Sequence, residues 1–133
     1  MLKGIYVLII QVDRNINVKV GAKGRFTFKK GLYAYVGSSQ NNLEKRVNRH
    51  LGKEKRRFWH VDYLLDNDAA RIVEVFYEQA NKTEECAVAR IISTKGEPII
   101  GFGASDCRCH SHLFSIEDYG FLRKFLLVLD AKT

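Results

Sequence analysis

The spacing of apolar residues divides this chain into alternating strands and helices. Residues 4–12 are apolar on both faces and rich in β-branched side chains, which is typical of a central strand covered on both sides. Residues 32–37 alternate between tyrosines and aliphatic side chains, as a half-covered strand does. Two short stretches, 18–20 and 25–28, lie between them. We expect these four segments to form an antiparallel β-meander.

Helical periodicity begins directly after the second long strand. Leu43, Val47 and Leu51 recur at intervals of four residues, which predicts a helix that buries these three side chains. Residues 38–41 offer several caps for the start of the helix, among which Asn41 has capping-box spacing with Glu44, and Gly52 suits its end.

The second half of the chain continues with both kinds of element. The patterns predict a short helix at 58–65, a strand at 70–77, a helix at 83–93 and a final helix at 116–129. This order predicts a single α+β domain over residues 1–133. Its centre would be a small antiparallel β-sheet of three or more strands, flanked by helices.

The chain is basic, and its positive charge is concentrated in one region. The formal net charge is +7 and the sequence pI is about 9.4. Seven of the 22 Lys and Arg residues lie within thirteen positions: Lys45, Arg46, Arg49, Lys53, Lys55, Arg56 and Arg57. Such a cluster favours contacts with nucleic-acid phosphates, and the alternative is a solvated basic surface. Trp59, directly after the cluster, would stack on unpaired bases or belong to the core.

The cysteine count and the apolar N-terminus indicate the cellular compartment of the protein. Three cysteines are an odd number, which argues against a disulfide framework and for a reducing environment. The apolar run at 5–10 is too short for a membrane span or a secretory signal. We therefore predict a soluble cytoplasmic protein with no membrane partner. The oligomeric state stays open.

Two tyrosine tripeptides and one helix hold the first candidate site. Residues 4–6 read Gly-Ile-Tyr, and residues 35–37 read Tyr-Val-Gly. In the helix that follows, Arg46 and His50 are four positions apart and therefore share a face. A guanidinium beside an imidazole indicates a shared anionic partner such as phosphate. The alternative is two ordinary surface residues of a basic helix.

An acidic residue in the 83–93 helix is a further candidate. Glu85 precedes Val88 and Ile92 at three and seven positions, so it begins the buried face. A carboxylate at the margin of a core needs a cation or a metal ion as its partner. Glu84 is a second choice for the same role. Alternatively, Glu85 serves only the helix dipole in the first turn.

A short segment rich in cysteine and histidine forms a second candidate site. Its thiol and imidazole groups suit Zn2+ and lie within six positions: Cys107, Cys109, His110 and His112. A second interpretation is a tight loop of small residues beside the active cleft. In a third interpretation, Ser105, Asp106 or His112 supplies a polar group to that cleft. Asp106 is also a candidate for a second metal ligand.

Taken together, residues 4–92 resemble the GIY-YIG nuclease superfamily. The resemblance rests on the Gly-Ile-Tyr and Tyr-Val-Gly tripeptides, on Arg46 with His50, and on a glutamate in a later helix. Nearly the whole chain is also similar to an uncharacterised prokaryotic branch of that superfamily. The shared tracts are residues 31–39, 59–64, 85–86, 101–109 and 111–113.

This resemblance implies a GIY-YIG-like fold and a metal-dependent endonuclease acting on DNA or RNA. Glu85 would hold one divalent metal ion, Mg2+ or Mn2+. Tyr6 would help to take the proton from the attacking water, and Tyr35 would orient that water or the scissile phosphate. Arg46 would neutralise charge on the phosphoryl group, and His50 would assist proton transfer or positioning.

Three departures from the superfamily pattern keep other functions open. Val36 stands where isoleucine is usual, the interval between the tripeptides is long, and no asparagine follows Pro98. One alternative is a nucleic-acid-binding domain on the same fold that has lost catalysis. Another is a zinc-stabilised interaction module. In the nuclease interpretation, a partner protein would supply target specificity.

Overall fold

A six-stranded antiparallel sheet forms the centre of the protein. The computed structural model describes residues 3–52, 60–100, 102 and 111–129. The strands run in the order β6-β7-β4-β1-β5-β8. β1 (Gly4–Val12) lies between β4 (Gly31–Ser39) and β5 (Ala70–Glu78), and nearly all of its residues are buried. The predicted central strand is therefore confirmed.

Short strands complete the sheet on both sides. β7 (Leu113–Ile116) pairs with β4, and β6 (Gly96–Pro98) pairs with β7. On the other side, β8 (Leu127–Val128) pairs with Phe76 and Tyr77 of β5. All of these pairings are antiparallel, so connections between neighbouring strands can be short.

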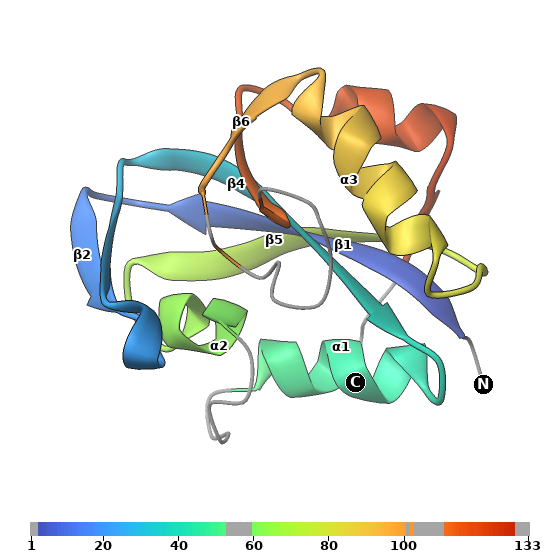
Figure 1. Ribbon diagram of the computed structural model, residues 1–133, viewed down its shortest axis with the longest axis horizontal. Helices are drawn as coiled ribbons and strands as arrows, with labels where there is room; N and C mark the ends of the chain where they lie inside the picture. The colour runs from blue at the N-terminus through green and yellow to red at the C-terminus, as the bar shows by residue number, and fades with distance from the viewer. Residues whose placement is uncertain (1–2, 53–59, 101, 103–110, 130–133) are drawn as a thin grey trace.

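Helices cover both faces of the sheet. α1 (Leu43–Leu51) and α2 (His60–Leu65) lie on one face, and α3 (Glu84–Ser93) lies on the opposite face (Figure 1). Each face has its own apolar core, because side chains alternate along β1 and β4. The α+β prediction is confirmed. Within the described residues, no helix is long and apolar enough to cross a membrane.

The start and the buried face of α1 differ from the prediction. The N-cap is Asn42 rather than Asn41, and its side-chain oxygen accepts a hydrogen bond of 3.0 Å from the Lys45 backbone N–H. Leu43 and Val47 are buried as predicted, but Leu51 is 38% exposed. His50 is buried in its stead, which is unusual for a basic residue and calls for polar partners.

The predicted β-meander is wrong in one respect. β2 (Ile16–Lys19) and β3 (Arg25–Phe28) form a separate two-stranded sheet, joined by a short 3-10 turn, η1 (Gly21–Lys23). The physical reason is that β4 and β5 already occupy both edges of β1. The hairpin instead packs apolar side chains into the core beside α2.

The predicted final helix at 116–129 is also wrong. This segment holds the end of β7, a 3-10 turn η2 (Gly120–Lys124), and β8. Leu122 and Leu126 are buried at the helical spacing that suggested a helix. After the turn, the chain pairs with β5 as a strand and does not continue as a helix. The Leu129 N–H donates a hydrogen bond of 2.9 Å to the Val75 carbonyl. Glycine at the start of η2 disfavours a longer helix.

Candidate active site

The register between β1 and β4 places the two motif tyrosines on one face of the sheet. Tyr6 pairs with Gly37, and Leu8 pairs with Tyr35. Residues directly opposite each other in a sheet point to the same side, as do residues two apart on one strand. Tyr6 and Tyr35 therefore both face α1, and both are buried in the core on that side.

The glycines of the two tripeptides are required by close packing. A Cβ at Gly37 would overlap the ring and the hydroxyl of Tyr6. A Cβ at Gly4 would overlap the backbone carbonyl of Glu78 on β5, and the φ of +155° at Gly4 is one that other residues rarely adopt. Each glycine lets a neighbouring group approach, and Gly37 thereby sets the position of the Tyr6 ring.

α1 brings an imidazole and a guanidinium to the tyrosines. His50 Nε2 lies 2.8 Å from the Tyr6 hydroxyl, and the two rings are 5.5 Å apart between centroids. The Tyr35 ring meets His50 edge-on, with its centroid at 6.4 Å. Arg46 donates a hydrogen bond of 2.6 Å from Nη1 to the Ser38 carbonyl at the end of β4. The Arg46 side chain also forms a hydrogen bond with the Tyr6 hydroxyl.

Both tyrosine hydroxyls are held in their neutral form. Burial raises the pKa of Tyr6 far above its ordinary value, while the charge and the hydrogen bond of Arg46 act in the opposite direction. Burial likewise raises the pKa of Tyr35, and the neighbouring Tyr6 adds to the effect. At neutral pH, these phenols are hydrogen-bond donors and acceptors, not phenolates.

Glu85 belongs to the same electrostatic cluster, although α3 covers the opposite face of the sheet. Its negative charge adds to the effect of burial in raising the pKa of both Tyr6 and Tyr35. Its side chain is 16% exposed, and Oε2 lies 3.0 Å from His112 Nδ1. The structure therefore gathers four of the predicted site residues, namely Tyr6, Tyr35, Arg46 and His50. Glu85, on α3, acts on the two tyrosines through its charge.

His112 is the member of the predicted Cys/His segment that lies within the described residues. It precedes β7, where its backbone N–H donates to the Phe102 carbonyl and its own carbonyl accepts from Val36. Nε2 lies 4.0 Å from the Cys86 sulfur on α3. The other members lie outside the described residues: Asp106, Cys107, Cys109 and His110. Within the described part, no group of three or more potential ligands could hold a metal ion.

The basic cluster is only partly described. Lys45 is exposed on α1, as a phosphate contact requires. Arg49 instead points to Asp62 on α2 and forms hydrogen bonds of 3.2 and 3.3 Å with its two oxygens. A guanidinium engaged in this way is a weaker candidate for nucleic acid than predicted. The remaining members lie outside the described residues: Lys53, Lys55, Arg56, Arg57 and Trp59.

Asp62, on α2, was not among the predicted site residues but lies beside His50. Its side chain is fully buried, and Oδ1 lies 3.6 Å from His50 Nδ1. His60, two positions before Asp62, packs against the ring of Phe102 at a steep angle. A signal for Asp62 was present, since it lies three positions before Leu65 and so shares its buried helical face.

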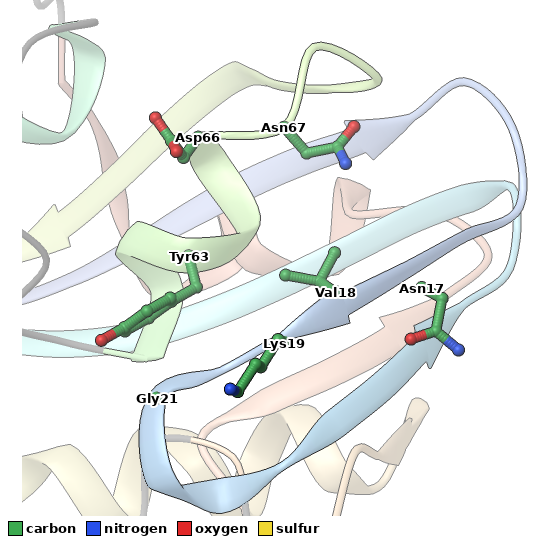
Figure 2. Close-up of a pocket in the computed structure, with 7 residues that line it drawn as sticks. All are labelled: Asn17, Val18, Lys19, Gly21, Tyr63, Asp66 and Asn67. Atoms are coloured by element: carbon green, nitrogen blue, oxygen red, sulfur yellow. The ribbon is translucent and has the colours of Figure 1, made fainter.

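A separate pocket of about 500 Å3 lies between β2 and α2. Figure 2 shows Tyr63 and Asp66 on its α2 side and Val18 and Lys19 on its β2 side. None of the five site residues lines it. The candidate active site therefore lies outside this pocket.

A family model spans almost the whole of this architecture, from residue 5 to residue 129. The chain belongs to the family described as Domain of unknown function DUF123. No match was found among curated proteins or among solved structures. The matched region of this DUF123 chain contains all five predicted site residues.

The buried tyrosines predict how the stability of the DUF123 domain depends on pH. Above about pH 10, tyrosines ionise in the unfolded chain while Tyr6 and Tyr35 stay neutral in the folded one. The unfolded state then binds fewer protons, so the free energy of unfolding decreases as pH rises. Urea unfolding at several alkaline pH values measures this slope. The Tyr6→Phe/Tyr35→Phe variant should show a shallower slope, and equal slopes would contradict the assignment.

Proposed function

We propose that this domain is a metal-dependent phosphodiesterase that cleaves DNA or RNA, with chemistry of the GIY-YIG type. One observation carries the proposal. Two buried phenols, a guanidinium and an imidazole from three different elements share one site, and the charge of Glu85 on a fourth element acts on both phenols. Perturbed titratable groups gathered in this way are typical of catalytic sites. The net charge of +7 suits a polyanionic substrate.

In this proposal, Arg46 neutralises the phosphoryl group. Its guanidinium is partly exposed and is anchored at one end by the Ser38 carbonyl, so its orientation is set before substrate binds. Fixed cationic donors act most strongly where negative charge develops in the transition state. Tyr35, neutral and buried beside it, orients the attacking water or the phosphate by hydrogen bonding.

Tyr6 and His50 form the proton path. Because Tyr6 is neutral, its hydroxyl cannot take a proton from water without releasing its own. His50 Nε2, at 2.8 Å, is placed to receive that proton. The attacking water therefore loses a proton to the Tyr6 oxygen, and the Tyr6 hydroxyl proton passes to His50. The net change is one proton moved from water to His50.

Glu85 is the residue that would hold a divalent cation. A single carboxylate fits Mg2+ or Mn2+, which keep several water ligands and bind through one or two carboxylates. A bound cation would supply Lewis-acid stabilisation of the phosphate. His112, which directly precedes β7, orients this carboxylate, since its Nδ1 lies 3.0 Å from Glu85 Oε2.

Cleavage assays with plasmid, single-stranded DNA and RNA in Mg2+ or Mn2+ test the proposal. The wild type should cleave at least one substrate, and Arg46→Ala should lower the rate about a hundred- to a thousandfold, the effect of removing one transition-state donor. Arg90→Ala, which removes an exposed guanidinium from α3, is the matched control and should stay within a few-fold of the wild type. Cleavage that survives Arg46→Ala would contradict the mechanism.

The same samples separate catalysis from binding alone. Gel-shift titrations at increasing salt report phosphate contacts through their slope. Salt-dependent binding without cleavage of any substrate would overturn the enzymatic proposal. It would favour a nucleic-acid-binding domain on this fold instead.

A further inference from the structure

Asp62 is a buried carboxylate to which the proposed chemistry assigns no role. Its side chain has no exposed surface, and burying such a charge is costly unless it is paired. Arg49 of α1 supplies a pairing cation, with Nη1 at 3.2 Å from Oδ1 and Nη2 at 3.4 Å from Oδ2. The Arg49 side chain is 25% exposed. The pair fixes the carboxylate of α2 against α1.

The same carboxylate faces the imidazole of His50. Oδ1 lies 3.6 Å from Nδ1, while the other ring nitrogen, Nε2, lies 2.8 Å from the Tyr6 hydroxyl. His50 thus stands between Asp62 and Tyr6. A neutral imidazole has one N–H donor and one acceptor nitrogen, and its neighbours decide which nitrogen has which role.

We propose that Asp62 fixes the tautomer of His50, with the proton on Nδ1 and the lone pair on Nε2. In the opposite tautomer, the Nδ1 lone pair would face a carboxylate at 3.6 Å inside the protein, where like partial charges repel strongly. In the assigned tautomer, the Nδ1 proton and the carboxylate attract each other across 3.6 Å, a charge–dipole contact without a hydrogen bond. Nε2 then accepts the Tyr6 hydroxyl proton in a hydrogen bond.

The other surroundings of His50 are consistent with this assignment. The ring of Tyr35 is tilted by 70° from the imidazole, and its buried hydroxyl is neutral. A small pocket of about 140 Å3 also borders His50, and its lining is mostly aliphatic: Leu51, Gly52, Leu65, Ala70, Arg71 and Ile72. Among the described residues, Asp62 is therefore a negative charge that lies beside this ring.

The consequence for catalysis rests on the proposed function. His50 can receive the proton of Tyr6 only if Nε2 is unprotonated beforehand. After the transfer, the imidazolium carries protons on both nitrogens, and the carboxylate of Asp62 stabilises its charge. Asp62 touches neither substrate nor water in this scheme. It is a positioning residue that acts through His50.

Nitrogen NMR of 15N-histidine-labelled protein at mildly alkaline pH tests the tautomer directly. In the wild type, His50 should show a protonated Nδ1 and an unprotonated Nε2, assigned by comparison with His50→Gln. In Asp62→Asn, the side-chain amide can donate to Nδ1, so the population should shift to the Nε2-protonated form. A wild-type spectrum with Nε2 protonated, or an unchanged tautomer in Asp62→Asn, would overturn the proposal.

Arg49→Lys is the matched control, because it keeps a positive charge beside Asp62 while removing the guanidinium fork. It should retain the wild-type tautomer of His50. In the cleavage assay, Asp62→Asn should lower kcat about a hundredfold with little change in KM, the usual effect of losing a positioned base. Absence of any wild-type cleavage would refute the proposed function, and the spectra would still decide the role of Asp62.

Discussion

Replacing Glu85 by glutamine is expected to lower the rate of metal-dependent cleavage by about a thousandfold. Glutamine keeps the shape of the side chain and its first-turn position in α3, but removes the charge that would hold the cation. Metal stabilisation of a phosphoryl transition state is worth several kcal/mol, and each 1.36 kcal/mol is a factor of ten in rate. Single-turnover cleavage in Mg2+ and in Mn2+ measures the loss.

Glu84→Gln provides the matched control for this experiment. Glu84 is the preceding residue of the same helical turn, has the same charge and is exposed. Its replacement changes net charge and helix dipole as Glu85→Gln does, so cleavage should stay within a few-fold of the wild type. Equal losses in both variants would show that general charge, and not a ligand, is responsible.

A second readout of Glu85→Gln does not depend on activity. The charge of Glu85 raises the pKa of Tyr6 and of Tyr35. Removing it should therefore lower both pKa values, and Glu84→Gln should leave them unchanged. Ultraviolet titration of the tyrosines can follow this difference. No change in Glu85→Gln would contradict the proximity of the carboxylate to the site.

Replacing Gly37 by alanine is expected to destabilise the fold by about 1–3 kcal/mol or more, the cost of overpacking a close-packed core. The new Cβ would overlap the Tyr6 ring, which is buried between β4 and α1 and has little room to move. Denaturant unfolding should show a lower midpoint. Where the domain still folds, displacement of Tyr6 from His50 should also reduce cleavage.

A double-mutant cycle tests whether the Tyr6 ring is the cause. In the Tyr6→Ala background, the ring that the alanine methyl group would meet is absent, so Gly37→Ala should cost much less stability. Gly120→Ala is the matched glycine control, since nothing lies within 4 Å of a Cβ at that position. Equal costs of Gly37→Ala in both backgrounds would show that backbone strain, not the ring, is decisive.

Much of the framework could be predicted because it depends on local patterns. The apolar run of β1, the alternation in β4 and the spacing of Leu43 and Val47 each report a buried face within a few residues. The same patterns failed at 116–129, where the apolar residues suit a helix and a strand equally well. There, pairing with β5 decides, and its partners are about fifty positions away in the chain.

The five candidate residues and their spacing are properties of the sequence alone, since residue type and helical or strand period can be read without coordinates. Their convergence is a property of the tertiary structure. Only the register of β1 with β4 brings Tyr6 to Gly37, and only the packing of α2 on α1 sets Asp62 beside His50. The physical reason is that such contacts join residues that no local period relates. The polar partners of a buried imidazole emerge only when separate helices and strands pack together.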